Sequence, residues 1–464
     1  MALWTFKEIA TALKVEPLLA EDIHGISIDS RQVSPEDLFI AIDGAQNDGH
    51  QYVEMAFKKG AVGAIVHKKL PNMDQKRLFM VEDTQKALYQ LADAARLRMM
   101  GKVIAITGSV GKTGLKECLA HILKGQGKIH YTQGNLNNHF GLPLTLCRMP
   151  KDTDYGIFEI GMNHAGEITP LVQLLNPHIA AITAIAEAHA EFFDGARDIA
   201  KAKAEIFLGF EGEGRVLLPG DDEQADYLTQ CAIDADVSTI ATFGTTTNRN
   251  YCARNIKIDL QGSQFDVVMS YEGLSHNFKA HTQTWGRHYV LTAIAALGLV
   301  HLAEGDVEKA VERLAAFTNP KGRGAILQTQ LQGKPLTLID DAYNANESSM
   351  KAALSLFENS EIPQSTRYAI LGEMLELGIK SADAHLALRE SILKANLNHL
   401  WLVGTDIYPL YQVLKNDMDV TYKENIKDIL PHITETLPAN AWLLVKGSHG
   451  SHVYKLVEEI NKNQ

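Results

Sequence analysis

The sequence is poor in cysteine, and its four cysteines lie far apart without any C-x-x-C spacing (Cys118, Cys147, Cys231 and Cys252). This scatter argues against a disulfide framework or a cysteine-based zinc site, and it favours reduced thiols in a cytoplasmic protein. An excess of positive charge is also missing, because the formal net charge is −12. A protein that binds nucleic acid needs a basic surface, so the charge argues against such a partner.

Long apolar runs are missing as well. Residues 289–303 come nearest to a membrane span, but this run is short and contains His301, so we expect a buried helix there. The N-terminal segment MALWTFKEIATALK carries both charge signs and lacks the unbroken apolar centre of a signal peptide. An apolar fraction of 45% supports ordinary globular cores, and 464 residues correspond to about three domains.

The stretch VIAITGSVGKT, residues 103–113, is the most informative segment of the chain. Its β-branched first half predicts a buried parallel strand, and apolar residues at helical spacing from Leu115 predict a helix that stops at Gly125. A strand, a glycine turn with Lys-Thr and a helix form the layout that binds a nucleoside triphosphate. Backbone N–H groups surround phosphate oxygens, Lys112 reaches the terminal phosphates, and the Thr113 hydroxyl binds Mg²⁺.

The spacing of this turn, G-x-x-G-K-T, is shorter than that of the general phosphate-binding loop, GxxxxGK[ST]. Ile106 stands where the general loop has glycine. A chance glycine turn is the alternative interpretation. We prefer the nucleotide interpretation because both flanking segments have the required type of secondary structure.

The order of predicted strands and helices indicates an α/β protein with three domains. Residues 1–98 form a small N-terminal α/β domain, and residues 99–315 form a central domain with a P-loop-type parallel sheet. Residues 316–464 alternate strands and helices after a turn at 319–322, which predicts a Rossmann-like domain. We expect helices at 3–13 and 52–58, and strands at 38–42, 61–66, 78–81, 103–107, 156–160, 179–185, 215–218, 239–243, 264–270, 336–339, 368–371, 400–403 and 442–445.

Polar residues after predicted strands are candidates for the rest of the site, because ligands bind outside the carboxyl ends of parallel strands. Glu159 ends a strand and could reach the same metal as Thr113, although a surface glutamate is an equally good interpretation. His189 follows the next strand, and Lys201 and Lys203 lie in a predicted helix. From the pattern alone, a structural histidine and a solvated helix face are favoured for these three residues.

Amide side chains follow another predicted strand, at Asn135, Asn137 and Asn138. They could hold sugar or phosphate oxygens, and turn residues are the competing interpretation. In the first domain, Ser30 and Arg31 could bind a polar ligand, although ordinary turn chemistry is favoured there.

Two predicted strands of the last domain also end in polar groups. Asp341 could bind a ribose hydroxyl, while Lys446 and Ser448 offer a cation and a hydroxyl. Either segment could simply cap a helix, with Ser448 as the capping residue. Two such strand ends in one sheet make an edge that faces a ligand the better interpretation.

Several motifs together resemble the Mur ligase family: TGSVGKT, EIG at 159–161, the block 189–203, GRH at 286–288 and KGS at 446–448. The resemblance covers nearly the whole chain, including SIDSRQVSPEDLFIAIDG in the first domain. DDAYNAN and TQGNLNNHFG are similar to the members that add D-alanyl-D-alanine to UDP-N-acetylmuramoyl-tripeptide. The resemblance implies an ATP-dependent amide ligase that works through an acyl phosphate in peptidoglycan precursor synthesis, in the cytoplasm and as a monomer.

The resemblance also implies roles for individual residues. ATP would be bound by Thr107, Gly108, Ser109, Val110, Gly111, Lys112, Thr113, His288, Arg323 and Asp341. Two Mg²⁺ ions would be held by Thr113, Glu159, His189 and Lys203, with Lys203 carbamylated so that a cation becomes an anion. The catalytic residues would be Lys112, Lys203, His189 and Arg323.

The substrates would lie on both sides of the ATP. The resemblance puts Ser30 and Arg31 near the uridine, and puts Asn135, Asn137 and Asn138 beside the UDP-sugar. The D-alanyl-D-alanine end would be lined by Tyr343, Asn344, Lys446 and Ser448. We expect the third domain to close over the middle one and to bring Arg323, Asp341 and Lys446 to a site centred on Lys112.

Two positions depart from the family pattern. Tyr289 follows His288 where the family usually has asparagine, and Glu347 follows the NAN motif where proline is usual. The alternatives are another amide ligase of this superfamily, including a folylpolyglutamate-type enzyme, a P-loop ATPase that acts as a switch, and a small-molecule kinase. They differ in which amine stimulates phosphate release, in whether phosphate is released without an acceptor, and in whether a phosphorylated product accumulates.

Overall fold

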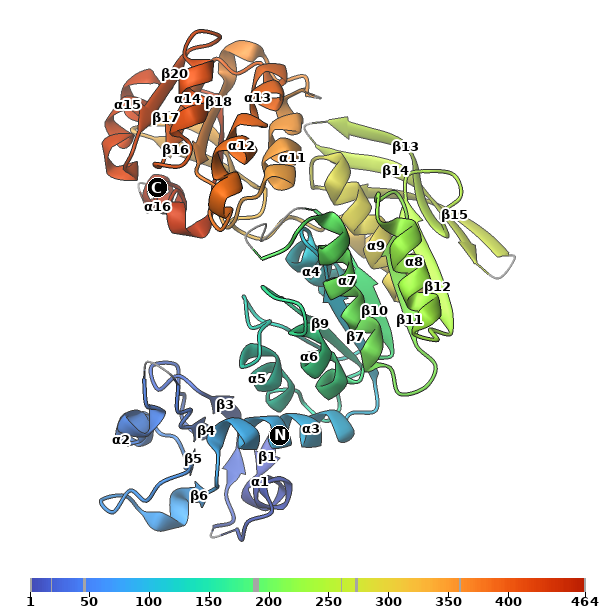
Figure 1. Ribbon diagram of the computed structural model, residues 1–464, viewed down its shortest axis with the longest axis vertical. Coiled ribbons are helices and arrows are strands. Elements are labelled where there is room, and N and C mark those ends of the chain that lie inside the picture. Colours follow the sequence, from blue (N-terminus) through green and yellow to red (C-terminus); the bar gives the residue numbers. More distant parts are fainter. Residues whose placement is uncertain are drawn as a thin grey trace.

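A computed structural model describes residues 2–17, 19–44, 47–186, 192–259, 261–271, 274–358 and 360–462. Three domains follow one another along the long axis of the molecule, with the N-terminal domain at one end and the C-terminal domain at the other (Figure 1). We refer to the elements from β1 to α3 as the N-terminal domain, from β7 to α10 as the central domain, and from β16 to α16 as the C-terminal domain.

The N-terminal domain is built on a parallel sheet in the order β3-β4-β5-β6, with a small antiparallel pair, β1 and β2, beside it. Helix α1 begins where the Thr5 hydroxyl and the Glu8 carboxylate form a capping box. The elements are β1 (Trp4–Thr5), α1 (Phe6–Leu13), β2 (Asp22–Ile23), β3 (Gly25–Ser27), β4 (Asp37–Ile40), α2 (Val53–Lys58), β5 (Gly63–Val66), β6 (Leu78–Met80) and α3 (Thr84–Leu97).

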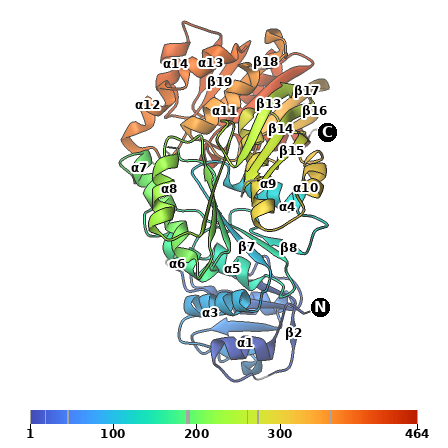
Figure 2. The ribbon, with the colours of Figure 1, turned by 90° about the vertical axis from the view of Figure 1, so that its right-hand side faces the viewer.

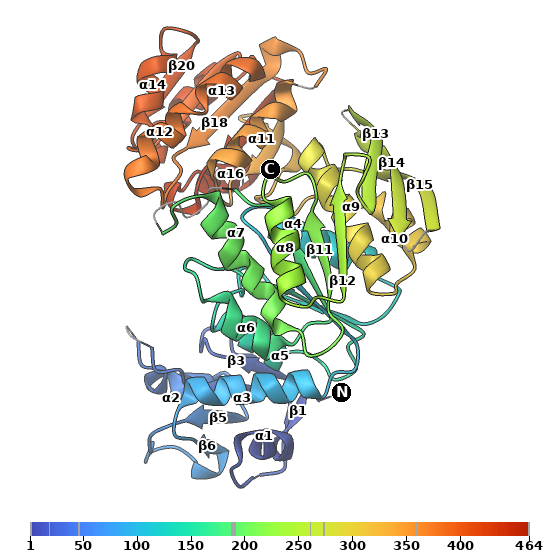
Figure 3. The ribbon, with the colours of Figure 1, turned by 45° about the vertical axis from the view of Figure 1, so that its right-hand side comes forward.

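Helix α3 joins the N-terminal domain to the central domain, because it packs on α1 on one side and on α5 on the other. It lies crosswise between the N-terminal sheet and the helices α5 and α6 (Figure 3). Polar contacts cross the same interface. The Trp4 indole donates to the Cys147 carbonyl at 2.8 Å, and the Arg148 guanidinium donates to the Ile26 carbonyl at 2.7 Å. The Arg98 guanidinium also stacks on the Trp4 ring, 3.5 Å from its centre.

The central domain contains a twisted sheet in the order β15-β14-β13-β12-β11-β10-β7-β9-β8. Strands β7 to β13 run parallel, and β14 and β15 extend the sheet at one edge through antiparallel pairing. The strands are β7 (Lys102–Thr107), β8 (Ile129–Tyr131), β9 (Tyr155–Glu159), β10 (Ile179–Ile182), β11 (Arg215–Pro219), β12 (Thr239–Gly244), β13 (Tyr251–Asp259), β14 (Gly262–Tyr271) and β15 (Leu274–Thr282).

Helices cover both faces of this sheet, as Figure 2 shows. One face carries α5 (Gly141–Cys147), α6 (Ile168–Leu175), α7 (Ala196–Ala204) and α8 (Ala225–Asp234), and the other carries α4 (Lys112–Ile122), α9 (Arg287–Leu302) and α10 (Val307–Leu314). Alternate residues of β7 enter the two cores: Val103 and Ala105 on the first side, Ile104 and Ile106 on the second. This two-sided burial explains why residues 103–106 of the strand are all apolar.

Strand β7 lies between β9 and β10 in the sheet, so the chain changes direction across it. The carboxyl ends of these parallel strands meet at one edge. In sheets of this kind a ligand binds in the crevice at such a reversal point. The fold therefore directs attention to the loops after β7, β9 and β10.

The C-terminal domain has a sheet in the order β16-β17-β21-β18-β19-β20, parallel except for β16. Its strands are β16 (Ala325–Leu331), β17 (Lys334–Asp341), β18 (Arg367–Gly372), β19 (His399–Val403), β20 (Val420–Lys423) and β21 (Ala441–Lys446). Its helices are α11 (Glu347–Glu358), α12 (Ser381–Leu386), α13 (Arg389–Ala395), α14 (Tyr408–Leu414), α15 (Leu430–Thr436) and α16 (Tyr454–Lys462). Neighbouring strands β17 and β21 end side by side in Asp341 and Lys446.

The predicted α/β fold in three domains is confirmed. The expected strands correspond to β4, β5, β6, β7, β9, β10, β11, β12, β14, β17, β18, β19 and β21. The run at 289–303 lies almost entirely within α9, whose apolar residues are largely buried. Across the residues that the structure describes, no helix combines the length and apolarity that a bilayer crossing requires.

Some expectations were wrong in detail. The helix expected at 3–13 begins only at Phe6, because Trp4 and Thr5 pair with β2. The strand expected at 179–185 ends at Ile182. The sheet of the central domain is not wholly parallel, since the β14–β15 hairpin extends it.

Candidate active site

A cavity of about 790 Å³ lies between the central and C-terminal domains. The turn after β7, the loop after β8, the end of β9 and the first turn of α9 line it on one side. The ends of β17 and β21 line it on the other. It gathers many of the residues that the sequence predicts for the site: Ser109, Val110, Gly111, Lys112, Thr113, Asn135, Asn137, Asn138, Glu159, His288, Arg323, Asp341, Tyr343, Asn344 and Lys446.

The glycine turn after β7 is held tightly against β10. Gly108 has φ +150°, and a Cβ there would lie 1.9 Å from the Thr183 hydroxyl oxygen, so a side chain cannot be placed. The Thr183 hydroxyl donates to the Val110 carbonyl at 2.5 Å, and the Ser109 amide donates to the Ala184 carbonyl at 2.8 Å. The turn therefore delivers the N-terminus of α4 to the cavity in a fixed orientation, which suits an anionic group.

Lys112 folds back over this turn, and its ammonium donates to the Gly108 carbonyl at 2.6 Å. Removal from water lowers the pKa of Lys112; the nearby Glu159 carboxylate opposes this shift, and the Arg323 cation adds to it. Two cations, Lys112 and Arg323, thus line one cavity. A bound anion such as a phosphate would relieve their repulsion.

Glu159 is held by its neighbours and is only 3% exposed. The Thr113 hydroxyl donates to one carboxylate oxygen at 2.8 Å, and the Asn137 amide donates to the other at 2.9 Å. Among the described residues, no group of three His, Cys, Asp or Glu side chains could hold a metal ion. A carboxylate and a hydroxyl still suit Mg²⁺, which usually takes few protein ligands and completes its shell with phosphate and water oxygens.

Lys203 is buried on α7, and Lys201 on the same helix is exposed. The solvated helix face that the pattern suggests is therefore wrong for Lys203. Burial, and secondarily the charge of Lys112, lower the pKa of Lys203 well below its usual range. Its amine is thus unusually ready to be neutral. His189 lies outside the described residues.

On the opposite wall, the Lys446 ammonium pairs with the Asp341 carboxylate at 2.8 Å and donates to the Asn344 carbonyl at 3.1 Å. Burial raises the pKa of Asp341, while Lys446 and Arg323 oppose the rise. Across the cavity, in the first turn of α9, burial and the charge of Lys446 lower the pKa of His288 to about 4, so this imidazole is neutral at physiological pH. Arg323 stacks on the Tyr343 ring, 4.1 Å from its centre.

Several predicted residues do not line the cavity. Thr107 is buried and donates to the Ile160 carbonyl, and Gly108 is not among the residues that line the cavity. The Ser448 hydroxyl accepts from the Leu375 amide at 3.0 Å inside the C-terminal domain. Asn138 does line the cavity, but its side-chain oxygen caps α5 by accepting from the amides of Phe140 and Gly141.

Ser30 and Arg31 lie in the N-terminal domain. Ser30 is 5% exposed, and the Arg31 guanidinium is paired with Asp29 at 2.8 Å. Neither residue lines the cavity at the glycine turn. Only a long ligand could touch both places.

Sequence reasoning missed Lys116, which follows Lys112 by one helical turn and is wholly buried. Its ammonium donates to the Thr132 carbonyl at 2.7 Å and lies 3.1 Å from the Glu117 carboxylate and 3.8 Å from that of Glu159. Its helical position relative to Leu115 and Leu119 was the available signal. Lys116 thus supports Glu159 from below the site.

We expect Lys116→Met to destabilise the protein, because the buried Glu159 carboxylate loses a nearby cation and the Thr132 carbonyl loses its donor. Losing one partner of a buried ion pair costs about 3–5 kcal/mol. Urea unfolding followed by circular dichroism measures the change. Lys124→Met is the matched control, since Lys124 is exposed just beyond α4 and should change stability by less than about 0.5 kcal/mol. Equal stability of the two variants would contradict the assigned role.

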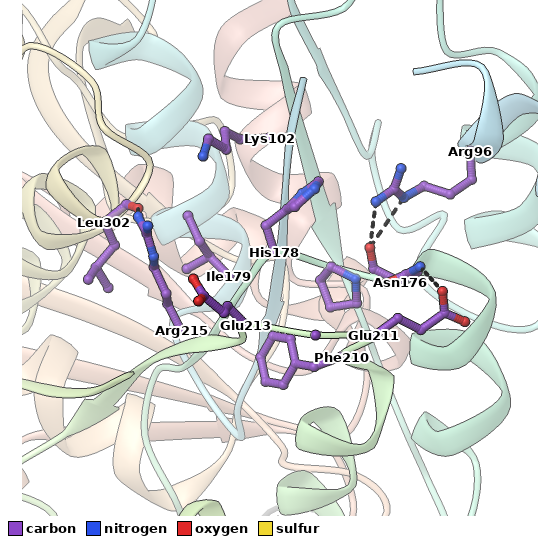
Figure 4. Close-up of a pocket in the computed structure, with 12 residues that line it drawn as sticks. Arg96, Lys102, Asn176, His178, Ile179, Phe210, Glu211, Glu213, Arg215 and Leu302 are labelled. Carbon is purple, nitrogen blue, oxygen red and sulfur yellow. Dashed lines mark hydrogen bonds between the residues drawn. The ribbon is translucent and has the colours of Figure 1, made fainter. Parts of the chain in front are cut away.

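A second hollow, of about 350 Å³, lies at the opposite edge of the central sheet (Figure 4). Its cations are already engaged within the fold. Arg96 donates to the carbonyls of Leu175 and Asn176, and Lys102 and Arg215 share the Glu304 carboxylate. None of the predicted site residues lines this hollow. We interpret it as a polar structural hollow at the amino ends of β7, β10 and β11.

Comparison with known proteins matches three family profiles along the chain. Residues 22–96 match "Mur ligase family, catalytic domain", residues 106–300 match "Mur ligase middle domain", and residues 322–449 match "Mur ligase, glutamate ligase domain".

Individual proteins match over nearly the full length. The UDP-N-acetylmuramoyl-tripeptide–D-alanyl-D-alanine ligase of Rickettsia prowazekii (strain Madrid E) is 34% identical over 98% of this chain and 99% of its own. The enzyme of the same name from Bacillus subtilis (strain 168) is 32% identical, over 94% and 93%. A crystal structure of MurF from Acinetobacter baumannii superposes with a TM-score of 0.84 at 28% identity, covering 98% of each chain.

Proposed function

The chain belongs to the Mur ligase family, and on this basis we propose how its interdomain cavity carries out the reaction. The protein is an ATP-dependent, ADP-forming peptide ligase. It joins D-alanyl-D-alanine to UDP-N-acetylmuramoyl-tripeptide in peptidoglycan synthesis. The observation that carries the proposed site is that the glycine turn, Glu159 and cations of the C-terminal domain line one cavity.

The chemistry must first activate an inert carboxylate. The carboxylate of the tripeptide attacks the γ-phosphorus of ATP, ADP leaves, and an acyl phosphate forms. The amine of D-alanyl-D-alanine then attacks the acyl carbon, inorganic phosphate leaves, and the nitrogen loses a proton. A free α-amino group has a pKa of about 7.7–8.0, so much of it is already neutral near pH 7.5.

The residues of this chain mainly supply positive charge and orientation. The N-terminus of α4 and Lys112 would hold the ATP phosphates, where negative charge gathers during transfer. Arg323 lies on the opposite wall of the cavity and would offset the repulsion between ATP and the carboxylate. His288 is neutral and lies beside Tyr289, and it would form an uncharged wall for the adenine base of ATP.

Thr113 and Glu159 fit Mg²⁺ by their oxygen donors, and the family resemblance adds His189 and Lys203 for a second ion. The bound metal would withdraw charge from the phosphoryl oxygens. We propose that the Lys203 amine is carbamylated: it adds CO₂, loses a proton and becomes a carbamate anion. The support is its burial and its lowered pKa, because only the neutral amine adds CO₂.

The substrates would occupy the two ends of the assembly. We propose that Ser30 and Arg31 contact the uridine, and that the UDP-sugar lies beside Asn135, Asn137 and Asn138. The D-alanyl-D-alanine end would be lined by Tyr343, Asn344, Lys446 and Ser448. Domain boundaries at 98 and 315 fit this division. Because one chain lines the whole cavity and the substrates include ATP, we further propose a cytoplasmic monomer.

The deciding experiment measures phosphate release from ATP and UDP-N-acetylmuramoyl-tripeptide, with D-alanyl-D-alanine added or withheld. We expect sustained release only with the dipeptide, together with the ligated product by mass spectrometry. Steady release without an acceptor would indicate an ATPase switch. A stable phosphorylated product would indicate a kinase, and stronger stimulation by another amino acid would indicate a different ligase.

A further inference from the structure

We propose that Tyr289 is a positioning residue that fixes Arg323 at the phosphate end of the cavity, by donating a hydrogen bond to the Arg323 backbone carbonyl. The bond length is 2.8 Å, and it joins residues that are 34 positions apart. Tyr289 lies in the first turn of α9 in the central domain, whereas Arg323 lies in the linker just before β16, the first strand of the C-terminal domain. The inference rests on the proposed function, in which Arg323 acts on the transferred phosphoryl group.

The linker that carries Arg323 is already attached to the C-terminal domain. The Gly322 amide donates to the Asp340 carboxylate at 2.8 Å, and the Gly324 amide donates to the Asp340 carbonyl at 2.7 Å. These bonds fix the linker to the end of β17. The hydrogen bond from the Tyr289 hydroxyl instead ties the same linker to the central domain.

The position of the hydroxyl is built into the linker sequence. Gly324 has φ +81°, and a Cβ there would lie 2.0 Å from the Tyr289 hydroxyl oxygen. Any other residue at 324 would displace the phenol as well as strain the backbone. The glycine therefore makes room for Tyr289 at the point where the hydrogen bond forms.

The Arg323 side chain leaves this fixed backbone toward the cavity. Its guanidinium stacks on the Tyr343 ring, 4.1 Å from the ring centre, and its charge reaches Lys112. Tyr289 thus holds the backbone of Arg323, while Tyr343 supports its charged end. A small shift of the backbone carbonyl would be carried to the guanidinium at the end of a long side chain.

A second contact shows that this end of α9 is docked on the C-terminal domain. Trp285, four residues before Tyr289, is only 4% exposed and stacks on Trp442 of β21, with ring centres 5.1 Å apart. This apolar contact keeps the two domains adjacent even when the phenol is removed. Tyr289→Phe should therefore leave the fold intact and change only the position of Arg323.

The test is a double-mutant cycle with Tyr289→Phe and Arg323→Ala, using ATP as the varied substrate. We expect Tyr289→Phe to lower kcat about tenfold with KM for ATP changed less than about threefold, since the lost bond acts in the transition state. Arg323→Ala should cost about 100-fold. The double variant should match Arg323→Ala within about twofold, because the hydroxyl acts through the arginine.

Tyr251→Phe is the control, because it removes a phenol oxygen that contacts His301 at the other end of α9. It should stay within about twofold of wild type. For Tyr289→Phe, the unfolding temperature and the calorimetric affinity for Mg²⁺-ADP should change little. If Tyr289 only stabilised the fold, the substitution would lower one or both of them.

Two results would overturn the inference. If Tyr289→Phe is fully active, or if it lowers kcat of the Arg323→Ala enzyme by the same factor, then Tyr289 does not act through Arg323. If Arg323→Ala itself keeps normal turnover, the role of Arg323 in the proposed function fails first, and the inference fails with it.

Discussion

Lys112→Ala is expected to abolish ATP-dependent ligation while the chain remains folded. The ammonium lies over the glycine turn, 2.6 Å from the Gly108 carbonyl, where phosphate oxygens would replace that contact. Stabilisation of the charge that develops on phosphoryl oxygens in this cavity depends strongly on such a group. Losing one preorganised donor costs about 10²–10³ in kcat, and a full positive charge should cost at least that much.

The measurement is phosphate release with all three substrates, compared with Lys124→Ala. Lys124 is an exposed lysine just past α4, so this control loses one charge without entering the cavity. Circular dichroism and thermal unfolding should match wild type for both variants. Turnover of Lys112→Ala within a few-fold of wild type would mean that the nucleotide does not bind at this turn.

Lys203→Ala is expected to lose activity by about 100-fold, and added acetate or formate should restore part of it. The small acid would stand in for the carbamate that the variant cannot form. A loss of this size is typical when a group that supports a metal is removed. The matched control is Lys201→Ala, because Lys201 lies on the same helix and is exposed.

The sign of the pH effect follows from the depressed pKa of Lys203. At high pH the amine is neutral and can add CO₂, and as the pH falls the amine is protonated and the carbamate is lost. Activity should therefore fall on acidification in CO₂-free buffer and recover when bicarbonate is returned at higher pH. Full activity of Lys203→Ala without additive would remove Lys203 from the mechanism.

The sequence resemblance to Mur ligases is confirmed. Whether an individual helix or strand could be predicted depended on a different physical reason in each segment. The strand, turn and helix around Lys112 were predictable because their signals are local: a β-branched run, glycines and helical spacing. Helix α3 was missed, because its buried face includes Ala87, Ala92 and Ala95 and so gives a weak apolar pattern. Strand β13 was missed because much of its length is polar and exposed.

The site shows the same limit at the level of side chains. Asp341 and Lys446 were each predicted as polar strand ends, but their mutual ion pair depends on β17 lying next to β21, about which the intervening hundred residues say nothing. Lys203 looks like a solvated lysine in the sequence, and only the packing of α7 shows that it is buried. Lys116 is buried too, and its helical position relative to Leu115 and Leu119 was the one sequence signal for this.

The interface between the first two domains has a consequence for donor recognition. Trp4 and Arg148 bond directly to backbone carbonyls across it, so they tie the N-terminal domain to the central domain. With the uridine held near Arg31 as proposed, the distance from Arg31 to the phosphoryl site would set the length of the UDP-linked substrate. A substrate whose peptide is one amino acid shorter would end about 3.3–3.6 Å before the phosphoryl group. The enzyme would therefore select its UDP-linked substrate by the length of the peptide.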